Sequence, residues 1–243
     1  MAKSVKASDN TAPARKHKKA RDRKPRQERW TEILDVAART FAEKGYDGTS
    51  LQEIANRTGI LKGSIYYYIN TKEDMLAHLL RQAYETGLRR IRPIAESKHS
   101  AAIRLAEMIR AHVEYVCTDR DRTAVFLHER KRLSPEMRRK FLGDESTYGD
   151  LFEKVIAEGQ KEGSVPTELD PKLTAICLLG SLNATYQWFH HNEQYSVDEI
   201  SNHFVATTLR GIVREGSPTA RPRVAAKREI DPVNSSTRRS PRT

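Results

Sequence analysis

The segment of residues 49–72 constrains the fold more than any other part of the chain, because it has the pattern of two short helices joined by a turn. In its first part Leu51, Ile54 and Ala55 place apolar side chains on one face of a helix. Gly59 follows where the chain must turn tightly, and glycine adopts a positive φ there without steric cost. A second helix is predicted over the aromatic run that comes next. The spacing, about twenty residues in all, is that of a helix-turn-helix.

The rest of the chain between its two ends is also patterned as helix. Apolar side chains recur at helical spacing over residues 30–41 and again over residues 75–83. Residues that cap helix N-termini precede several of the predicted helices: Ser50, Thr71, Ser134, Asp170 and Ser196. No Asn-Gly or Asp-Gly pair is flanked by alternating apolar residues, so the sequence contains no hairpin signal. We therefore predict an all-α fold.

Charge divides the chain into a nearly neutral middle and two basic ends. Residues 1–26 carry ten basic and two acidic side chains, and residues 217–243 carry seven and two, within a chain of net charge +11. Both ends contain few apolar residues, so they cannot bury enough surface to offset the entropy of ordering. We predict four parts: a disordered basic tail (1–27), a helix-turn-helix domain (28–75), a larger helical domain (76–215) and a second disordered basic tail (216–243).

Several classes of protein are excluded by what the sequence lacks. It has no run of about 18 apolar residues that could span a membrane, and no apolar segment behind the basic N-terminus that would make a secretory signal. Cys117 and Cys177 are too few for a disulfide framework, and both are predicted to be reduced core residues. The His190-His191 pair does not have ligand spacing, so no metal is expected, and no cofactor or nucleophile motif is present. We expect a cytoplasmic protein without a membrane span or a cofactor.

The second helix of the motif carries side chains suited to DNA at its N-terminal end, where a recognition helix meets the base edges of the major groove. Lys62 can donate to guanine or to a phosphate, Gly63 lets the backbone approach the duplex, and Ser64 suits a base or a phosphate. Three consecutive tyrosines follow at positions 66–68. Because successive helical residues lie about 100° apart, at least one of them should face the core, and Tyr66 is the candidate for a mixed role.

The whole of residues 29–76 resembles the DNA-binding domain of TetR-family repressors, including the Phe41-x-x-x-Gly45-Tyr46 turn and the Lys72-Glu73-Asp74-Met75 start of the next helix. By position, the resemblance implies operator contacts by Thr49, Ser50, Gln52, Lys62, Gly63, Ser64, Tyr66, Tyr67, Tyr68 and Lys72. The sequence departs from the family at two positions: many members have phenylalanine in place of Ile69 and histidine in place of Tyr68. For Tyr68 a phosphate contact is therefore expected rather than a base contact. A purely capping role for Ser50 and a merely solvated position for Gln52 are the alternatives.

Residues 86–214 are predicted to form the second helical domain, which in TetR-family members binds a small molecule and forms a homodimer. Apolar residues surround nearly the whole of the helix expected from Leu173 to Phe189, and the next helix carries a stripe from Ile200 to Ile212. Two such helices meeting their symmetry mates would make a self-complementary four-helix interface. The alternative is that both helices pack only within their own chain.

Residues 159–183, with Tyr186-Gln187-Trp188 after them, are similar to a TetR subgroup of KstR-type and fatty-acid-type regulators, which sense acyl-CoA thioesters. Aromatic walls with a few polar groups suit an apolar ligand. The candidate pocket residues are Phe126, Arg130, Phe152, Asn183, Trp188 and Phe189. Plain core packing is the alternative for each of the aromatic residues.

These features together predict a homodimeric repressor, not an enzyme, that binds double-stranded operator DNA and leaves it when a small apolar ligand binds, an acyl-CoA being one candidate. The helix from Met75 to Leu88 is expected to link the two domains as a lever. One alternative is a sequence-nonspecific nucleic-acid-binding protein that depends on its basic tails, which their deletion would reveal. A less favoured alternative is an enzyme acting on acyl thioesters, although no nucleophile stands at a plausible spacing from a base.

Overall fold

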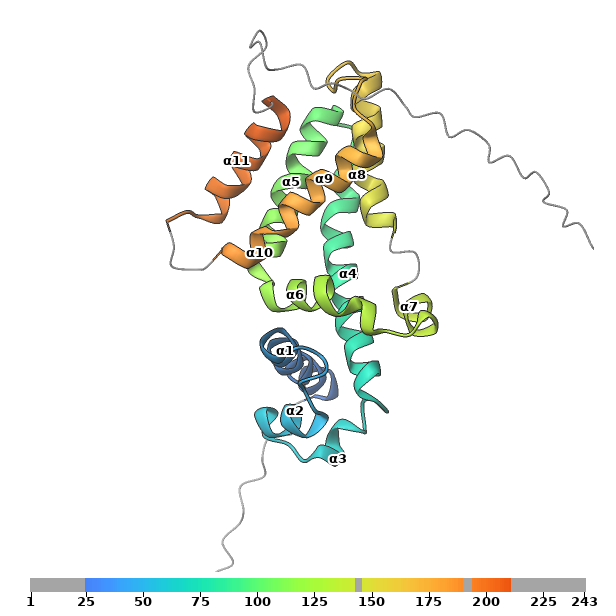
Figure 1. The fold of residues 1–243 in the computed structure, drawn as a ribbon, viewed down its shortest axis with the longest axis vertical. Coiled ribbons are helices and arrows are strands. Elements are labelled where there is room, and N and C mark those ends of the chain that lie inside the picture. The colour runs from blue at the N-terminus through green and yellow to red at the C-terminus, as the bar shows by residue number, and fades with distance from the viewer. Residues whose placement is uncertain (1–24, 143–145, 190–193, 211–243) are drawn as a thin grey trace, which may run out of the picture.

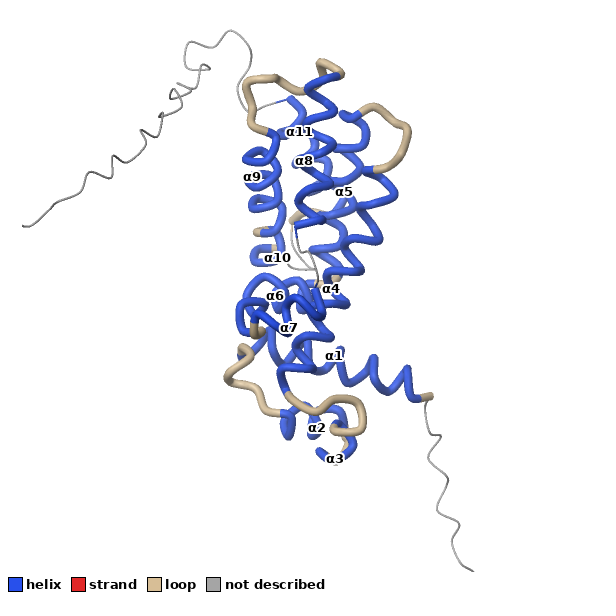
Figure 2. The backbone as a smooth tube through the Cα atoms, turned by 90° about the vertical axis from the view of Figure 1, so that its right-hand side faces the viewer, coloured by secondary structure: helices blue, strands red, loops and turns tan. Residues whose placement is uncertain are grey.

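The structure is a computed structural model that describes residues 25–142, 146–189 and 194–210. Within these residues it contains helices and no strand, as the sequence predicts (Figure 2). The helices are α1 (Arg26–Lys44), α2 (Leu51–Thr58), α3 (Lys62–Ile65), α4 (Lys72–Ala95), α5 (Ala101–Thr118), α6 (Arg120–Glu129), the 3-10 turn η1 (Arg130–Arg132), α7 (Pro135–Leu142), α8 (Ser146–Lys161), α9 (Pro171–Asn183), α10 (Thr185–Trp188) and α11 (Val197–Arg210). The two predicted tails lie outside the described residues, except that α1 already begins at Arg26, before the expected domain start at residue 28.

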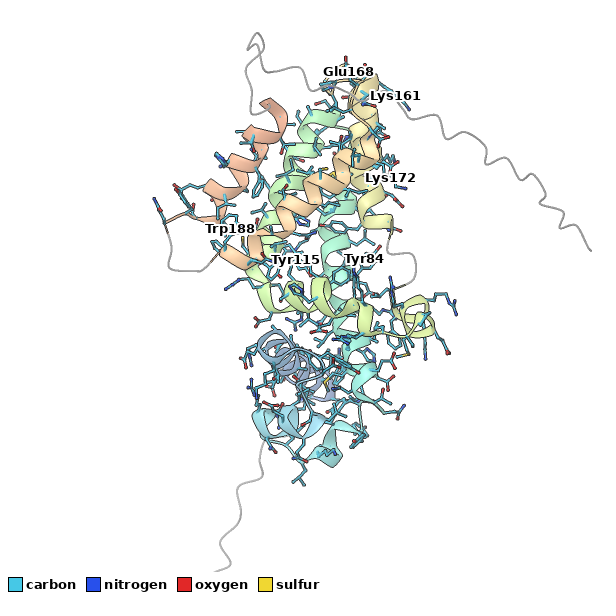
Figure 3. The ribbon with its side chains drawn as sticks, viewed as in Figure 1. Tyr84, Tyr115, Lys161, Glu168, Lys172 and Trp188 are labelled. Carbon is cyan, nitrogen blue, oxygen red and sulfur yellow. The ribbon has the colours of Figure 1, made fainter. Side chains whose placement is uncertain are left out.

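The molecule is elongated, with α1, α2 and α3 at one end (Figure 1). Helix α4 leads from them into a bundle, in which α11 packs along α5 and α8 packs against both α5 and α9. Helices α6 and α7 lie at the junction between the two parts, where α6 contacts α1 and both contact α4. The connection between α8 and α9, with Lys161 and Glu168, forms the end far from α3 (Figure 3). None of the described helices is long and apolar enough to cross a lipid bilayer.

Side-chain caps place helix starts where the sequence predicts them. The Thr71 hydroxyl accepts a hydrogen bond from the Asp74 N–H (3.0 Å), and the Asp74 carboxylate accepts one from the Thr71 N–H (2.9 Å), so α4 begins with a complete capping box. The Ser50 hydroxyl caps α2 by accepting from the Glu53 N–H at 3.1 Å. The Glu53 carboxylate pairs with Lys44 instead of closing the box. These caps fix where the chain enters and leaves the helix-turn-helix.

Two apolar cores stabilise the molecule, and α4 contributes to both. The first core is built from α1, α2, α3 and the start of α4, and includes Phe41 and Met75, which are almost fully buried. It also contains Val125, Leu133 and Leu142, which lie in or beside α6 and α7, far along the chain. The second core joins the end of α4 to α5, α8, α9 and α11. Helix α4 therefore connects the two cores, and the predicted boundary between residues 75 and 76 falls inside the first one.

The apolar segment from Leu173 to Phe189 differs from the single buried helix that the sequence predicts. Helix α9 ends before Ala184, where the chain tightens and the Gln187 N–H bonds to the Ala184 carbonyl three residues back (3.1 Å). The segment is also buried on one side only, since Leu173 and Ile176 each remain 59% exposed. Burial on several sides is therefore not reached within one chain.

Candidate nucleic-acid interface and internal cavity

The turn of the helix-turn-helix has the geometry that its glycine predicts. Gly59 ends α2 in the left-handed conformation (φ 70°, ψ 32°), and its N–H bonds back to the carbonyls of the last turn of α2. Ile60 packs against the first core, and Ile65 is completely buried in it. This buried anchor holds α3 with its other side toward solvent.

The exposed side of α3 presents the residues expected at a DNA surface. Lys62, Gly63 and Ser64 are all exposed at the start of the helix. The rings of Tyr66 and Tyr67 follow them, 47% and 66% exposed. From α2, Ser50 and Gln52 are also exposed, and the Gln52 side chain donates to the amide oxygen of Asn56 (2.9 Å). These side chains form the candidate interface, and none of them is needed to fill the core.

The tyrosine that packs inward is Tyr68, whereas Tyr66, the candidate for a mixed role, remains 47% exposed. The ring of Tyr68 stacks on Trp30 with the ring centroids 5.3 Å apart, and it contacts the first core. Helix α3 ends at Ile65, and the three tyrosines lie in a turn where the Tyr68 N–H bonds to the Ile65 carbonyl (2.8 Å). The helical period used to predict the facing tyrosine therefore does not continue through this run.

Thr49 is not available to DNA, which corrects its place among the predicted contacts. Its side chain is buried, and its hydroxyl donates to the Gly45 carbonyl at 2.9 Å and lies 3.3 Å from the Thr40 carbonyl. These bonds close the turn between α1 and α2 from inside. Thr49 thus positions the start of α2, with its hydroxyl bonded inside the chain.

The side chain of Lys72, which is predicted to contact a phosphate, is bonded within the domain. Its ammonium group donates to the carbonyls of Tyr46 (2.8 Å) and Thr49 (2.9 Å) and lies 4.2 Å from the centre of the Tyr46 ring. Burial, with nearby carboxylates, raises the pKa of the Tyr46 phenol above its ordinary value. Two of the three N–H donors of Lys72 therefore tie α4 to the turn between α1 and α2.

Sequence reasoning missed Arg26 as part of this surface. Its guanidinium lies 4.7 Å from the centre of the Tyr67 ring, at the start of α1. The prediction had assigned Arg26 to the disordered tail because the charge run continues up to it. The apolar stripe that begins at Trp30 could have moved the helix start back by one turn.

Polar contacts join α6 to α1 and to the turn before α2. Arg122 forms an ion pair with Asp35 of α1. The Glu129 carboxylate accepts a hydrogen bond from the Tyr46 N–H (3.1 Å), in the same turn that Thr49 and Lys72 hold. These contacts connect α6 to α1 and to the segment that precedes α2.

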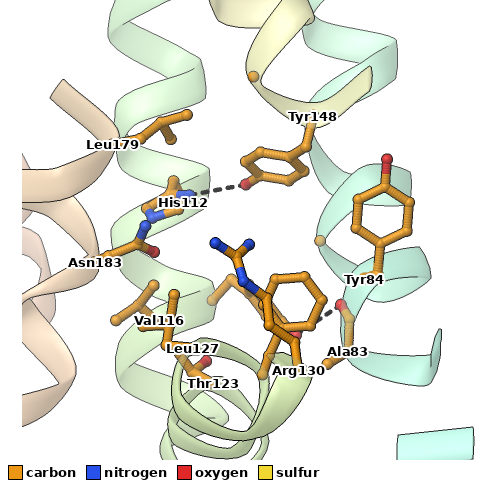
Figure 4. Close-up of a pocket in the computed structure, with 14 residues that line it drawn as sticks. Ala83, Tyr84, His112, Val116, Thr123, Leu127, Arg130, Tyr148, Leu179 and Asn183 are labelled. Atoms are coloured by element: carbon orange, nitrogen blue, oxygen red, sulfur yellow. Dashed lines mark hydrogen bonds between the residues drawn. The ribbon is translucent and has the colours of Figure 1, made fainter. Parts of the chain in front are cut away.

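A partly open cavity of about 210 Å³ lies beside α6, lined by residues of α4, α5, α6, η1, α8 and α9 (Figure 4). Three of the six predicted pocket residues line it: Phe126, Arg130 and Asn183. The other residues of its wall are Ala83, Tyr84, Gly87, His112, Tyr115, Val116, Thr123, Leu127, Tyr148, Gly149 and Leu179. At Gly87 in this wall a Cβ atom would lie 3.1 Å from the Tyr148 ring, closer than ordinary van der Waals contact.

The other three predicted pocket residues do not line this cavity. Phe152 is completely buried in the second core, where its ring meets His112 edge to face. Phe189 is also buried in this core, and Trp188 is 46% exposed at the end of α10. Cys177, expected in the core, is exposed on α9, whereas Cys117 is buried as predicted. Helical spacing predicts which residues are apolar on a face but not which of them surround a void.

The polar part of the cavity wall was missed by sequence reasoning. The Nδ1 atom of His112 lies 2.8 Å from the Tyr148 hydroxyl, and the side chain of Asn183 lies on the other side of the imidazole (Figure 4). Burial lowers the pKa of His112 to about 4, an effect that Asn183 only partly offsets, and burial raises the pKa of Tyr148. Both groups are therefore uncharged at neutral pH. A lone histidine within the apolar pattern of residues 101–118 was the available signal.

No group of three potential metal-binding side chains occurs within the described ranges. The His190-His191 pair lies outside them.

Comparison with known proteins covers both parts of the chain. Residues 33–79 match the model described as bacterial regulatory proteins of the tetR family, and residues 98–212 match the model of a tetracyclin repressor-like C-terminal domain. A curated relative, the HTH-type transcriptional repressor KstR2 of Rhodococcus jostii, is 28% identical over 76% of this chain and 91% of its own.

Two solved structures resemble the whole described fold. A transcriptional regulator of the TetR/AcrR family from Thermobifida fusca is 32% identical, with a TM-score of 0.60 over 77% of this chain and 100% of its own. AibR, solved in complex with isovaleryl coenzyme A and operator DNA, is 25% identical, with a TM-score of 0.68 over 74% of this chain and 97% of its own.

Proposed function

Since this chain belongs to the TetR family of DNA-binding transcriptional regulators, we propose that it binds its operator as a homodimer and dissociates when an acyl compound fills the cavity. It acts as a DNA-binding repressor, the role that the name of its KstR2 relative states. The observation that most supports the proposal is the exposed start of α3, held in place by the buried Ile65. Its site of action is then the cytoplasm, where operator DNA lies.

We assign the operator contacts to the exposed residues of α2 and α3. These are Ser50, Gln52, Lys62, Gly63, Ser64, Tyr66 and Tyr67. Lys62 is placed to contact a guanine or a phosphate from the N-terminal end of the recognition helix. Tyr68 and Lys72 support this surface from below, through the stacking on Trp30 and the bonds to the turn after α1.

The second copy would pack on the exposed apolar side of α9, which carries Leu173, Ile176 and Cys177. Leu209 of α11 is also partly exposed. A two-fold arrangement of these helices would bury side chains that a single chain leaves in water. It would also present two α3 helices to successive major grooves, about 34 Å apart.

We propose an acyl-CoA thioester as the effector class. The cavity has aromatic walls and a few polar groups, which suits an apolar ligand. AibR, a structural neighbour, was solved with isovaleryl coenzyme A and operator DNA. A cavity of about 210 Å³ is smaller than the roughly 300–1,000 Å³ of typical ligand pockets. It would hold the acyl group, with the rest of the coenzyme outside.

Helix α6 offers the route from the cavity to the operator contacts, because its two faces meet different partners. Arg122, Val125 and Glu129 face the DNA-binding end. Thr123, Phe126 and Arg130 (in η1) line the cavity. A ligand that prefers another position of α6 lowers operator affinity by the difference between its affinities for the two states. Helix α4, which contributes to both cores, would move with it as the expected lever.

The test of operator binding uses two substitutions in the proposed contact surface. Lys62→Ala and Tyr67→Ala should each weaken binding to a duplex selected by this protein from a random library, and together abolish its preference over a scrambled duplex. Fluorescence anisotropy measures the affinity, and light scattering checks that the oligomeric state is unchanged.

Matched controls are Lys161→Ala and Tyr195→Ala, since Lys161 lies at the far end of the molecule (Figure 3) and Tyr195 is 55% exposed. These controls should bind the selected duplex like the original protein. Unchanged preference in the Lys62→Ala, Tyr67→Ala double variant would contradict the proposed interface.

A further inference from the structure

Among the described residues that line the cavity, Arg130 is the one that carries a charge at neutral pH. Figure 4 shows the guanidinium of Arg130 extending into the cavity on the side of His112 and Tyr148. The described residues that line the cavity include no Asp, Glu or Lys. The imidazole of His112 is uncharged at neutral pH, because burial lowers its pKa to about 4. Arg130 therefore adds guanidinium N–H donors to this wall, which suit an electron-rich oxygen atom.

A buried hydroxyl group in the same wall points to a hydrogen-bonding ligand. Thr123 is only 5% exposed, and its Oγ1 atom has no hydrogen-bond partner within the part of the chain that the structure describes. Several other helical threonines bond back to a carbonyl, as Thr118 does to Glu114 (2.7 Å) and Thr58 does to Ile54 (2.6 Å). A buried hydroxyl without a partner costs free energy, which a ligand acceptor would recover.

Thr123 and Arg130 are placed to act together. They are seven residues apart on α6 and the turn that continues it, so they lie on the same face two turns apart. Both can donate to oxygen, the threonine through its hydroxyl and the arginine through its guanidinium. Between them on this face stands Phe126, whose ring lies 5.8 Å from the guanidinium carbon of Arg130.

We propose that the cavity binds the acyl end of its ligand by the oxygen: a carbonyl-type oxygen accepts hydrogen bonds from Thr123 and Arg130, and a compact carbon skeleton packs against Phe126, Val116 and Leu179. This inference rests on the proposed function, because it names the chemistry of the effector. A free carboxylate and a thioester carbonyl both provide such an oxygen. The acyl oxygen, rather than the coenzyme, is thus the feature recognised inside the protein.

The probes separate the oxygen from the rest of the ligand. Each of three acyl groups (isovaleryl, hexanoyl and benzoyl) is supplied as its CoA thioester, as the free acid and as a CoA thioether with a methylene group in place of the carbonyl. Calorimetry on the full chain measures each dissociation constant. At least one acyl group should bind as thioester or acid, and its thioether should bind about ten-fold more weakly or worse. The comparison of thioester with free acid identifies the source of the oxygen.

The variants test the two donors. Thr123→Val and Arg130→Met should each weaken binding of the preferred acyl probe by about ten-fold, and each should reduce the difference between thioester and thioether. Thr123→Val should not lower the Tm of the ligand-free protein, because it removes a polar atom without a partner.

The controls are Thr185→Val and Arg110→Met. Thr185 is also buried with an unpartnered hydroxyl but does not line the cavity, and Arg110 is a surface arginine bonded to Asn202. Both variants should bind the probe as the original protein does.

Each other outcome overturns the inference. The inference is wrong if Thr123→Val and Arg130→Met bind the preferred acyl probe as tightly as the original protein does. It is also wrong if the thioester and the thioether bind equally, or if none of the acyl probes binds. Operator binding measured on the same preparations distinguishes these results from failure of the proposed function. If the operator is bound through Lys62 while no acyl probe binds, only the ligand chemistry is wrong.

Discussion

His112 is an uncharged histidine within the second core, and its burial makes stability depend on pH. Its pKa is about 4 in the folded protein, compared with an ordinary value of 6.5. Between these values the unfolded chain binds more protons than the folded one, so the free energy of unfolding falls as the pH decreases. We expect a loss of about 2 kcal/mol from this group between pH 7 and pH 5. Urea unfolding of the original protein and of His112→Phe measures it, and an equal loss in both proteins would contradict the prediction.

Lys72 is predicted to stabilise the DNA-binding end rather than to contact phosphate. Lys72→Met removes two charge-assisted hydrogen bonds and should lower the free energy of unfolding by about 1–3 kcal/mol. The salt dependence of operator binding should keep its slope, because no phosphate contact is lost. Lys62→Ala should instead lower that slope by about 1. If both variants reduce the slope equally, Lys72 contacts the backbone of the operator.

The roles of the capping residues and of the turn glycine could be predicted from the sequence. The roles of the residues expected to contact DNA or to line the pocket could be predicted only in part. Ser50, Thr71 and Gly59 act locally, so a few neighbouring residues determine what they do. Thr49 precedes the cap Ser50, and from the sequence its hydroxyl could bond either to DNA or within the chain. Only the structure of the turn between α1 and α2 shows that this hydroxyl donates to the Gly45 carbonyl. Phe126 and Phe152 have the same helical context, yet one lines the void and the other fills the core.

Helix α6 was the element least predictable from the sequence, although it lies between the cavity and the helix-turn-helix. Its apolar residues do not form one clear stripe, because it faces the cavity on one side and α1 on the other. The sequence could place α1, α2 and α4 from their stripes and caps. It could not show that Val125 and Leu142 complete the core of α1–α3, since contacts so distant along the chain leave no periodic signal.

The link between α6 and the turn before α2 can be tested by removing Glu129. Glu129→Ala leaves the Tyr46 N–H without its acceptor, so the position of α6 should influence α2 less. The dissociation constant of the preferred acyl probe should stay within about two-fold, while the factor by which that probe lowers operator affinity should fall. Anisotropy titrations with and without the probe measure this factor.

Glu136→Ala, an exposed change on α7, is the matched control for Glu129→Ala. It should leave both quantities as they are. An unchanged factor in Glu129→Ala would mean that the coupling does not depend on the hydrogen bond between Glu129 and the Tyr46 N–H.

Considered as one body, the protein exposes an apolar strip on α9 that a second copy is proposed to cover. Leu173→Glu and Ile176→Glu place charges where a single chain leaves 59% of each side chain in water, so the folded monomer should tolerate them. In the dimer interface they should cause dissociation, and operator binding should weaken at least about 100-fold because only one half-site is contacted. Analytical ultracentrifugation measures the assembly state.

Ile103→Glu is the matched control, since Ile103 on α5 is 49% exposed. It should remain dimeric. A dimer that survives both α9 substitutions would place the interface elsewhere.

The first core, with its contributions from α6 and α7, has a practical consequence for protein engineering. A fragment cut after residue 75 would lose the side chains of Val125, Leu133 and Leu142 and expose their apolar neighbours to water. Grafting the operator specificity of this protein onto another sensor therefore requires transplanting the surface of α6 and α7 as well. Chimeras joined at the apparent boundary should aggregate, whereas those that keep these partners matched should remain folded.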